Sequence, residues 1–250
     1  ALRQITRARH MSVKPELGEL NDRYAVIKNI DGDCLIMQYL LDPGLDRERV
    51  SFMGFQAFHN AHCNQKMKIG EKEKKVAKDK YVTFDETMPL GKWWTEHPLR
   101  MEYEQIVFNP EGDVPKCYNL WRGFAVEERE GDCSLFKQHM LDNLCLGNEV
   151  YHEYLMNWMA RAVQRPELTG EVAVVLRGGE GTGKGLWARE FGALFGPHFM
   201  QVTQPEHMVG TFNAHLRDCV VLFADEAFFA GDKRHAEVLK SLITEPTVVL

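Results

Sequence analysis

Gly178-Gly179-Glu180-Gly181-Thr182-Gly183-Lys184-Gly185 is the stretch of sequence that decides the predicted fold. The apolar residues 172–176 before it are typical of a buried strand, and residues 186–191 after it are typical of a helix. Glycines let a turn curl so that successive backbone N–H groups point inward at phosphate oxygens. The start of the following helix adds its positive dipole end. All eight residues of this stretch are therefore predicted to bind the phosphates of a nucleotide.

The spacing of the loop follows the pattern G-x-x-x-x-G-K, which Gly178, Gly183 and Lys184 satisfy. Lys184 supplies a mobile positive charge for the β- and γ-phosphates. The next position usually carries Ser or Thr, whose hydroxyl holds Mg²⁺, and here it is Gly185. A loop with this departure has an alternative interpretation as a glycine-rich turn without a ligand.

A second motif supports the first. The apolar residues 219–224 lead into Asp225 and Glu226, as in a strand that ends in two acidic residues. Asp225 is predicted to hold the Mg²⁺ that bridges the phosphates, and Glu226 is predicted to deprotonate the attacking water. Alone, the same pattern is equally typical of an edge strand that runs into a solvated turn.

Strands and helices alternate after residue 168, which predicts an α/β fold with a parallel sheet covered by helices. Phosphate sites in such sheets lie beyond the carboxyl ends of the strands, where both motifs fall. A helical lead-in is expected over residues 126–168, with Ser134 as an N-cap and a helix over 149–164. The expected strands are 172–176, 199–203 and 219–224, and the expected helices are 184–195, 206–216 and 233–243.

Residues 1–125 are expected to form a smaller α+β region. Residues 23–30 and 34–37 are predicted to pair as a hairpin, and residues 52–63 to form a short helix. The run 66–80 holds seven lysines, which is typical of a solvated helix face or a mobile loop. A patch that follows nucleic-acid phosphates is the alternative interpretation. Trp93 and Trp94 are predicted to be core residues rather than platforms for bases.

Composition limits the class of protein. The chain has 250 residues, 44% of them hydrophobic and 26% charged, which is typical of a globular protein. No apolar run approaches the roughly 20 residues of a membrane span. The net charge of −6 requires any contact with DNA to come from a local patch. The beginning and end of the sequence suggest a piece of a longer protein.

The six cysteines form no C-x-x-C pair, so reduced, buried thiols in a cytoplasmic protein are expected. His59, His62 and Cys63 are close in sequence, but no second ligand pair follows at zinc spacing. We therefore expect these three to be ordinary helix residues.

Three core segments, residues 178–185, 212–218 and 223–227, resemble the helicase part of phage primase-helicases, which are superfamily 3 helicases of the poxvirus primase-helicase type. Residues 119–124 and 154–160 are similar to the segment that precedes the ATPase in those phage proteins. The resemblance covers about residues 90–250 and is strongest from residue 119 onward.

This resemblance implies an AAA+-like ATPase that uses ATP and Mg²⁺, assembles as a ring, usually a homo-hexamer, and moves 3′ to 5′ on single-stranded DNA. It implies that ATP lies between neighbouring subunits, and that a primase or polymerase domain stands upstream. Lys184 would bind phosphate, Asp225 would hold the metal and Glu226 would act as the base.

By the same resemblance, Lys233, Arg234 and Lys240 are candidates for contacts with the DNA strand or a neighbouring subunit. A solvated helix surface is an equally good interpretation of these three residues. The chain ends before the polar residue that senses the γ-phosphate in this family and before the arginine finger. The fragment alone is therefore not expected to unwind DNA.

Two other functions stay open at this point. One is a P-loop kinase acting on a small molecule, against which the adjacent acids 225 and 226 argue, because a base aimed at water wastes ATP. The other is a scaffold that holds nucleotide without turnover, which Gly185 keeps open.

Overall fold

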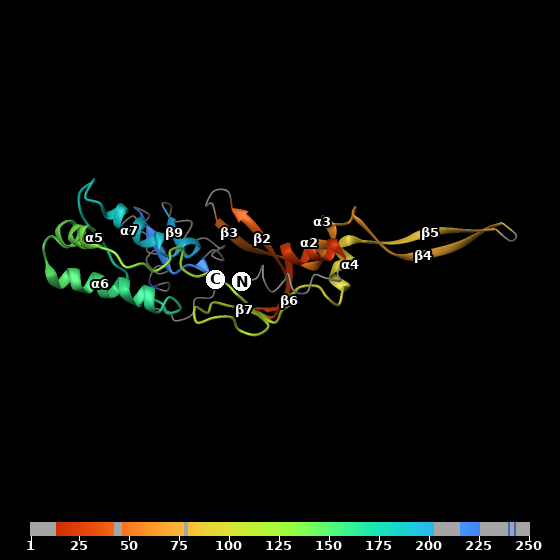
Figure 1. Ribbon diagram of the computed structural model, residues 1–250, viewed down its shortest axis with the longest axis horizontal. Coiled ribbons are helices and arrows are strands. Elements are labelled where there is room, and N and C mark those ends of the chain that lie inside the picture. The colour runs from red at the N-terminus through yellow and green to blue at the C-terminus, as the bar shows by residue number, and fades with distance from the viewer. Residues whose placement is uncertain are drawn as a thin grey trace. The chain divides into compact units, whose positions relative to one another are not determined.

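The computed structural model describes residues 14–42, 47–77, 80–202, 216–225, 240 and 243. The chain folds as two compact units, and many of their elements are labelled in Figure 1. Residues 113–118 join the described part of 1–107 in the first unit, and residues 108–112 join the described part of 119–250 in the second.

The first unit contains a four-stranded sheet with the strand order β3-β2-β1-β6. Strands β1 (Tyr24–Ile30) and β2 (Asp33–Asp42) are antiparallel, and Asp31 and Gly32 between them have φ angles of 53° and 95°. Two successive left-handed residues match the right-handed twist of a hairpin. The hairpin predicted over residues 23–37 is thus confirmed. The sheet is completed by β3 (Arg47–Met53), antiparallel to β2, and β6 (Glu102–Tyr103), parallel to β1.

Three helices contribute to the core of this unit: α2 (Pro15–Arg23), α3 (Phe55–Ala61) and α4 (Leu90–Glu96). The helix predicted over 52–63 is therefore confirmed with narrower bounds, and His62 and Cys63, which were expected to be helix residues, lie in the turn that follows it. Trp94 is fully buried, as predicted, and its indole N–H donates to the Oδ1 atom of Asn21 at 2.9 Å. One cluster of buried residues in this unit consists of Leu17, Leu20, Tyr24, Val26, Ile36, Phe58 and Trp94.

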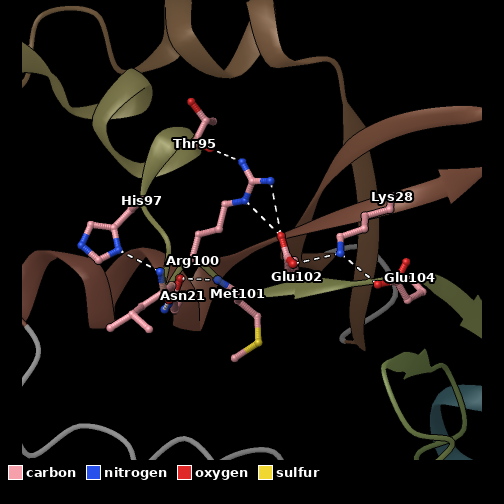
Figure 2. Close-up of polar contacts among 9 residues, drawn as sticks. Asn21, Lys28, Thr95, His97, Arg100, Met101, Glu102 and Glu104 are labelled. Carbon is pink, nitrogen blue, oxygen red and sulfur yellow. Dashed lines mark hydrogen bonds and ion pairs between the residues drawn. The ribbon is translucent and has the colours of Figure 1, made fainter.

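A polar network joins β6 to the neighbouring elements (Figure 2). The backbone N–H of Met101 also donates to Asn21 Oδ1, at 2.8 Å. The ammonium of Lys28 lies 3.0 Å from a carboxylate oxygen of Glu102 and 2.9 Å from one of Glu104. The hydrogen bond from Lys28 holds the pKa of Glu102 below its usual range, with a smaller contribution from Arg100.

The lysine-rich run does not form the helix or loop that its composition favours. Residues Lys66–Ala77 are strand β4, which pairs antiparallel with β5 (Lys80–Pro89) in a two-stranded hairpin. The prediction was wrong because cross-strand pairing with residues 80–89, which the run does not reveal by itself, decides the structure. A shorter ladder joins β7 (Gln105–Val107) to β8 (Cys117–Asn119).

The second unit begins with the predicted helical segment. Helix α5 (Ser134–His139) continues into a π-helical turn, η2 (Met140–Leu144), and α6 (Glu149–Gln164) has the predicted bounds. Ser134 is not the N-cap, because Cys133 holds that position without a side-chain bond. Asp132 instead accepts hydrogen bonds from the backbone N–H and the hydroxyl of Ser134, at 2.8 and 3.0 Å.

Strands β9 (Phe199–Val202) and β10 (Val221–Ala224) pair in parallel, which confirms the two later strands of the predicted core. Residues 172–176 form no strand: Val175 is 80% exposed, while Val174 and Leu176 pack against the buried cluster that includes Trp187. An extended segment needs a lateral hydrogen-bonding partner to become a strand, and no described strand pairs with it. The helices predicted over 206–216 and 233–243 lie outside the described residues, apart from Leu216, Lys240 and Ile243.

All six cysteines are free, and only Cys145 is buried, which raises the pKa of its thiol. Cys34, Cys63 and Cys133 are exposed, so the expectation of buried thiols was wrong for these three. They lie at a strand start, a turn and a helix start, where local apolar sequence does not ensure burial. Among the helices that the structure describes, none is long and apolar enough to cross a membrane.

Candidate functional site

The glycine-rich stretch forms a tight loop that leads directly into helix α7 (Lys184–Ala193). Gly181 and Gly183 have φ angles of 78° and 83°, which side chains other than glycine adopt only with strain. Gly183 is the N-cap of α7, and its carbonyl accepts the first helical hydrogen bond, from Trp187 at 3.0 Å. The predicted curl of the loop and the helix start at Lys184 are both present.

The side chain of Lys184 turns back over the loop. Its ammonium donates to the carbonyls of Gly178 and Gly179, at 3.0 and 2.7 Å, and contacts the hydroxyl of Thr182 at 3.1 Å. The Thr182 hydroxyl in turn donates to the Gly179 carbonyl at 3.1 Å. The positive charge of Lys184 is thus held beside the loop backbone. Because the lysine side chain is flexible, its ammonium can reach an anion bound in the loop.

His139, at the end of α5, packs against the N-cap of α7. A Cβ atom built on Gly183 would lie 2.6 Å from the Nε2 atom of His139, so a larger residue at position 183 requires the imidazole to move. Asn143 lies 2.9 Å from His139 Nδ1, and Nε2 is buried without a hydrogen-bond partner among the described residues. The π-helical turn that follows His139 is a type of distortion found often near functional sites.

The side chain of Arg189 lies against the place where a side chain at position 185 would begin. A Cβ atom at this position would lie 3.1 Å from the Nη1 atom of Arg189, one turn further along α7. Helical side chains point back toward the helix N-terminus, which brings residue 189 over residue 185. The place where a Ser or Thr side chain would stand is therefore next to a guanidinium group.

Asp225 follows the last residue of β10, as the sequence predicts. Its backbone N–H donates to the carbonyl of Val202 at 2.9 Å, and its carboxylate accepts from the amide of Gln201 at 3.2 Å. Phe223, two residues earlier, packs against the buried cluster that contains Trp187 of α7. Asp225 and Lys184 both lie in the described part of the chain, and no hydrogen bond joins their side chains there.

The other predicted site residues are tested less fully. Glu226, Lys233 and Arg234 lie outside the described residues, and Lys240 is an exposed helical residue. In the described part of the chain, no group of three or more His, Cys, Asp or Glu residues is placed to hold a metal ion. Mg²⁺ binding through Asp225 stays a prediction that needs oxygens from a nucleotide.

His198 is a structural residue that the sequence analysis did not single out. Its side chain is fully buried, its Nδ1 atom lies 2.6 Å from the Asp218 carbonyl and its Nε2 accepts from the backbone N–H of Arg122 at 2.9 Å. The ring stacks on Trp121, with centroids 4.6 Å apart. It thereby ties the segment around residue 121 to the turn before β10. A lone histidine after a proline carries no sequence signal for this role.

Comparison with known proteins gives two matches. Residues 176–250 match a family of unknown function, DUF5906. The solved structure described as "The apo structure of NrS-1 C terminal region (305-718)" is similar with a TM-score of 0.49 and 18% identity, over 85% of this chain and 49% of that chain. The present chain thus spans about half the length of that structure's chain. No curated protein matches the sequence significantly.

Proposed function

We propose that this chain is the nucleotide-binding part of an ATPase, and that residues 178–185 hold the phosphates. The observation that carries the proposal is the loop geometry: two left-handed glycines, a helix beginning at Lys184, and the ammonium of Lys184 held over the loop. Backbone N–H groups at a helix N-terminus, together with a lysine charge, are suited to a polyphosphate.

The proposed chemistry divides between the loop and the end of β10. Lys184 neutralises charge on the β- and γ-phosphates, Asp225 orients a metal ion, and Glu226 takes a proton from the attacking water. When bound, Mg²⁺ would offset the negative charge that develops on the phosphate oxygens. Asp225 is a suitable ligand because its carboxylate has only one hydrogen bond among the described contacts, from the neutral amide of Gln201.

We further propose that hydrolysis serves translocation on single-stranded DNA by a ring of identical subunits. This part of the proposal rests on the sequence resemblance of residues 178–185, 212–218 and 223–227 to superfamily 3 helicases. A nucleotide-binding scaffold without turnover is the second candidate, and it is favoured by Gly185, which cannot supply a hydroxyl to Mg²⁺.

ATP hydrolysis by the full-length protein, measured with and without single-stranded DNA, tests the proposal. We expect turnover that DNA stimulates, and we expect Glu226→Gln to bind ATP without hydrolysing it. Lys184→Ala should lose nucleotide binding and therefore activity. Its matched control, Lys92→Ala, changes an exposed lysine of α4 and should keep full activity. Tight ATP binding without any turnover would support the scaffold, and phosphate transfer to a metabolite would support a kinase.

A further inference from the structure

The hairpin formed by β4 and β5 extends well beyond the helices at its base (Figure 1). Met67 near that base is buried, whereas residues 71–77 and 81–85 are all exposed. A ribbon of two strands has no sheet to support it and is marginally stable in water by itself. Twelve and ten residues are long strands for such a ribbon, which points to a use for the exposed length.

The outer half of the hairpin has a charge opposite to that of the whole chain. Residues 72–84 include five lysines and two acidic residues, a net charge of +3, whereas the chain carries −6. The aromatic residues Tyr81 and Phe84 lie in the same segment and are 58% and 45% exposed. Lysines interleaved with exposed aromatic rings are the combination that binds single-stranded nucleic acid.

The strand register sorts these residues onto two faces. Lys72 pairs with Phe84 and Lys74 pairs with Val82, so these four residues share one face, which we call the hairpin face. Glu86 lies on the same face, nearer the base, and its carboxylate forms an ion pair with Lys72. Lys74 forms no ion pair with any residue that the structure describes. The hairpin face therefore presents an aromatic ring and a branched apolar side chain beside two lysines.

The opposite face is organised differently. Lys75 pairs with Tyr81 and its ammonium lies 5.8 Å from the centroid of that ring. Glu71 pairs with Asp85, and both lie within 3 Å of the Lys68 ammonium. This face carries the acidic residues Glu71, Glu73 and Asp85, and its Lys75 lies over the Tyr81 ring, so it is the weaker candidate for an anionic partner.

We propose that the hairpin face binds single-stranded DNA, with Phe84 stacked on a base and Lys72 and Lys74 beside the phosphates. This inference rests on the proposed function for the choice of DNA as the nucleic acid. It gives that function a strand contact in the first unit, separate from the nucleotide site. A second copy of the chain is the competing occupant, but an apolar contact between copies does not require lysines beside the ring.

The test is the binding of the protein to a labelled 30-nucleotide oligo-dT, followed by fluorescence anisotropy in the absence of ATP over a range of salt concentrations. Lys72→Ala combined with Lys74→Ala should weaken binding about 10-fold and lower the slope of log affinity against log salt by about 1.4, since each phosphate contact on a single strand contributes about 0.7. The paired control is Lys92→Ala with Lys137→Ala, both exposed lysines outside the hairpin, which should bind as the parent does.

Substitutions at Phe84 separate stacking from simple apolar contact. Phe84→Leu removes the ring but keeps an apolar side chain and should weaken DNA binding about 10-fold, whereas Phe84→Trp should bind at least as tightly as the parent. Equal DNA affinity for the parent, the double lysine variant and Phe84→Leu would overturn the proposal. The proposal would also be overturned if these variants changed only the oligomeric state, measured by light scattering, and left DNA affinity unchanged.

Duplex DNA of the same length provides the last comparison. Because stacking needs an unpaired base, the duplex should bind more weakly than oligo-dT and should not respond to Phe84→Leu; an equal response in both would overturn the stacking assignment. Anisotropy without nucleotide does not depend on hydrolysis. A protein that binds DNA through the hairpin but never hydrolyses ATP would therefore contradict the proposed function and leave this inference standing.

Discussion

The glycine-rich loop of residues 178–185 and the β4–β5 hairpin are held in opposite ways. The loop is fixed by its own backbone: Gly181 and Gly183 take left-handed angles, and His139 packs against the second of them. The hairpin is fixed by pairing between two strands, and only its base is buried. A motif that encodes its own geometry can be recognised from sequence, whereas a structure made by cross-strand pairing is concealed by its composition.

Matched glycine substitutions should separate the two regions most clearly. Gly183→Ala places a Cβ atom against His139 at a φ of 83°, so we expect a loss of about 3 kcal/mol in unfolding free energy and a loss of nucleotide binding. Gly70→Ala in the hairpin has ordinary contact, 3.7 Å from a Glu86 oxygen, and should change stability by less than about 0.5 kcal/mol. Urea unfolding of both variants measures the difference, and equal losses would contradict the account of the loop.

Removal of the buried imidazole near β10 should have a comparable effect on stability. His198→Ala leaves the Arg122 N–H and the Asp218 carbonyl without their present partner and removes the stack on Trp121, which should cost about 3 kcal/mol. Tyr81→Ala in the hairpin removes a ring of similar size that is 58% exposed, and should cost under about 1 kcal/mol. Thermal unfolding measures both losses. Equal unfolding midpoints for His198→Ala and Tyr81→Ala would contradict the structural role of His198.

The same contrast explains how much of the structure could be predicted. Residues 149–164 form a helix as predicted, because Asn148 caps it and its apolar residues repeat at helical spacing. The start of α7 was predicted because the lysine follows the last glycine of the motif. The hairpin was missed because a lysine-rich run is more typical of a solvated helix or loop. Residues 172–176 were predicted as a strand because apolar sequence does not reveal whether a neighbouring strand exists. His139 had no signal, because its contact with Gly183 joins residues 44 positions apart.

A smaller effect is expected at the other glycine of the loop. Gly185→Ser places its Cβ atom 3.1 Å from the end of the flexible Arg189 side chain, which can move aside. Serine also has a better helix propensity than glycine, so stability should rise by about 0.5 kcal/mol. Nucleotide affinity should be kept, in contrast to Gly183→Ala. Isothermal titration calorimetry with ATP and Mg²⁺ measures this affinity. A loss of affinity in Gly185→Ser would show that a side chain at residue 185 blocks the site.

The smallest effect concerns acid stability in the first unit. The pKa of Glu102 is lowered by its hydrogen bond from Lys28, so this contact stabilises the fold above the ordinary carboxylate pKa and is lost as the pH falls through the lowered value. Lys28→Ala should therefore destabilise the protein slightly at pH 7 and not at pH 2. Urea unfolding at both pH values measures this. A penalty that is the same at both would show that Lys28 acts through packing and not through charge.

The most direct test of the central claim is nucleotide binding by the loop itself. A fluorescent ATP analogue should be titrated, with Mg²⁺, into the parent protein, Lys184→Ala and the control Lys92→Ala. We predict saturable binding that is the same for the parent and Lys92→Ala and is weakened about 100-fold by Lys184→Ala, as expected when a charged hydrogen-bond donor to phosphate is removed. Equal affinity of all three proteins, or no binding by the parent, would contradict the assignment of residues 178–185 as a phosphate-binding loop.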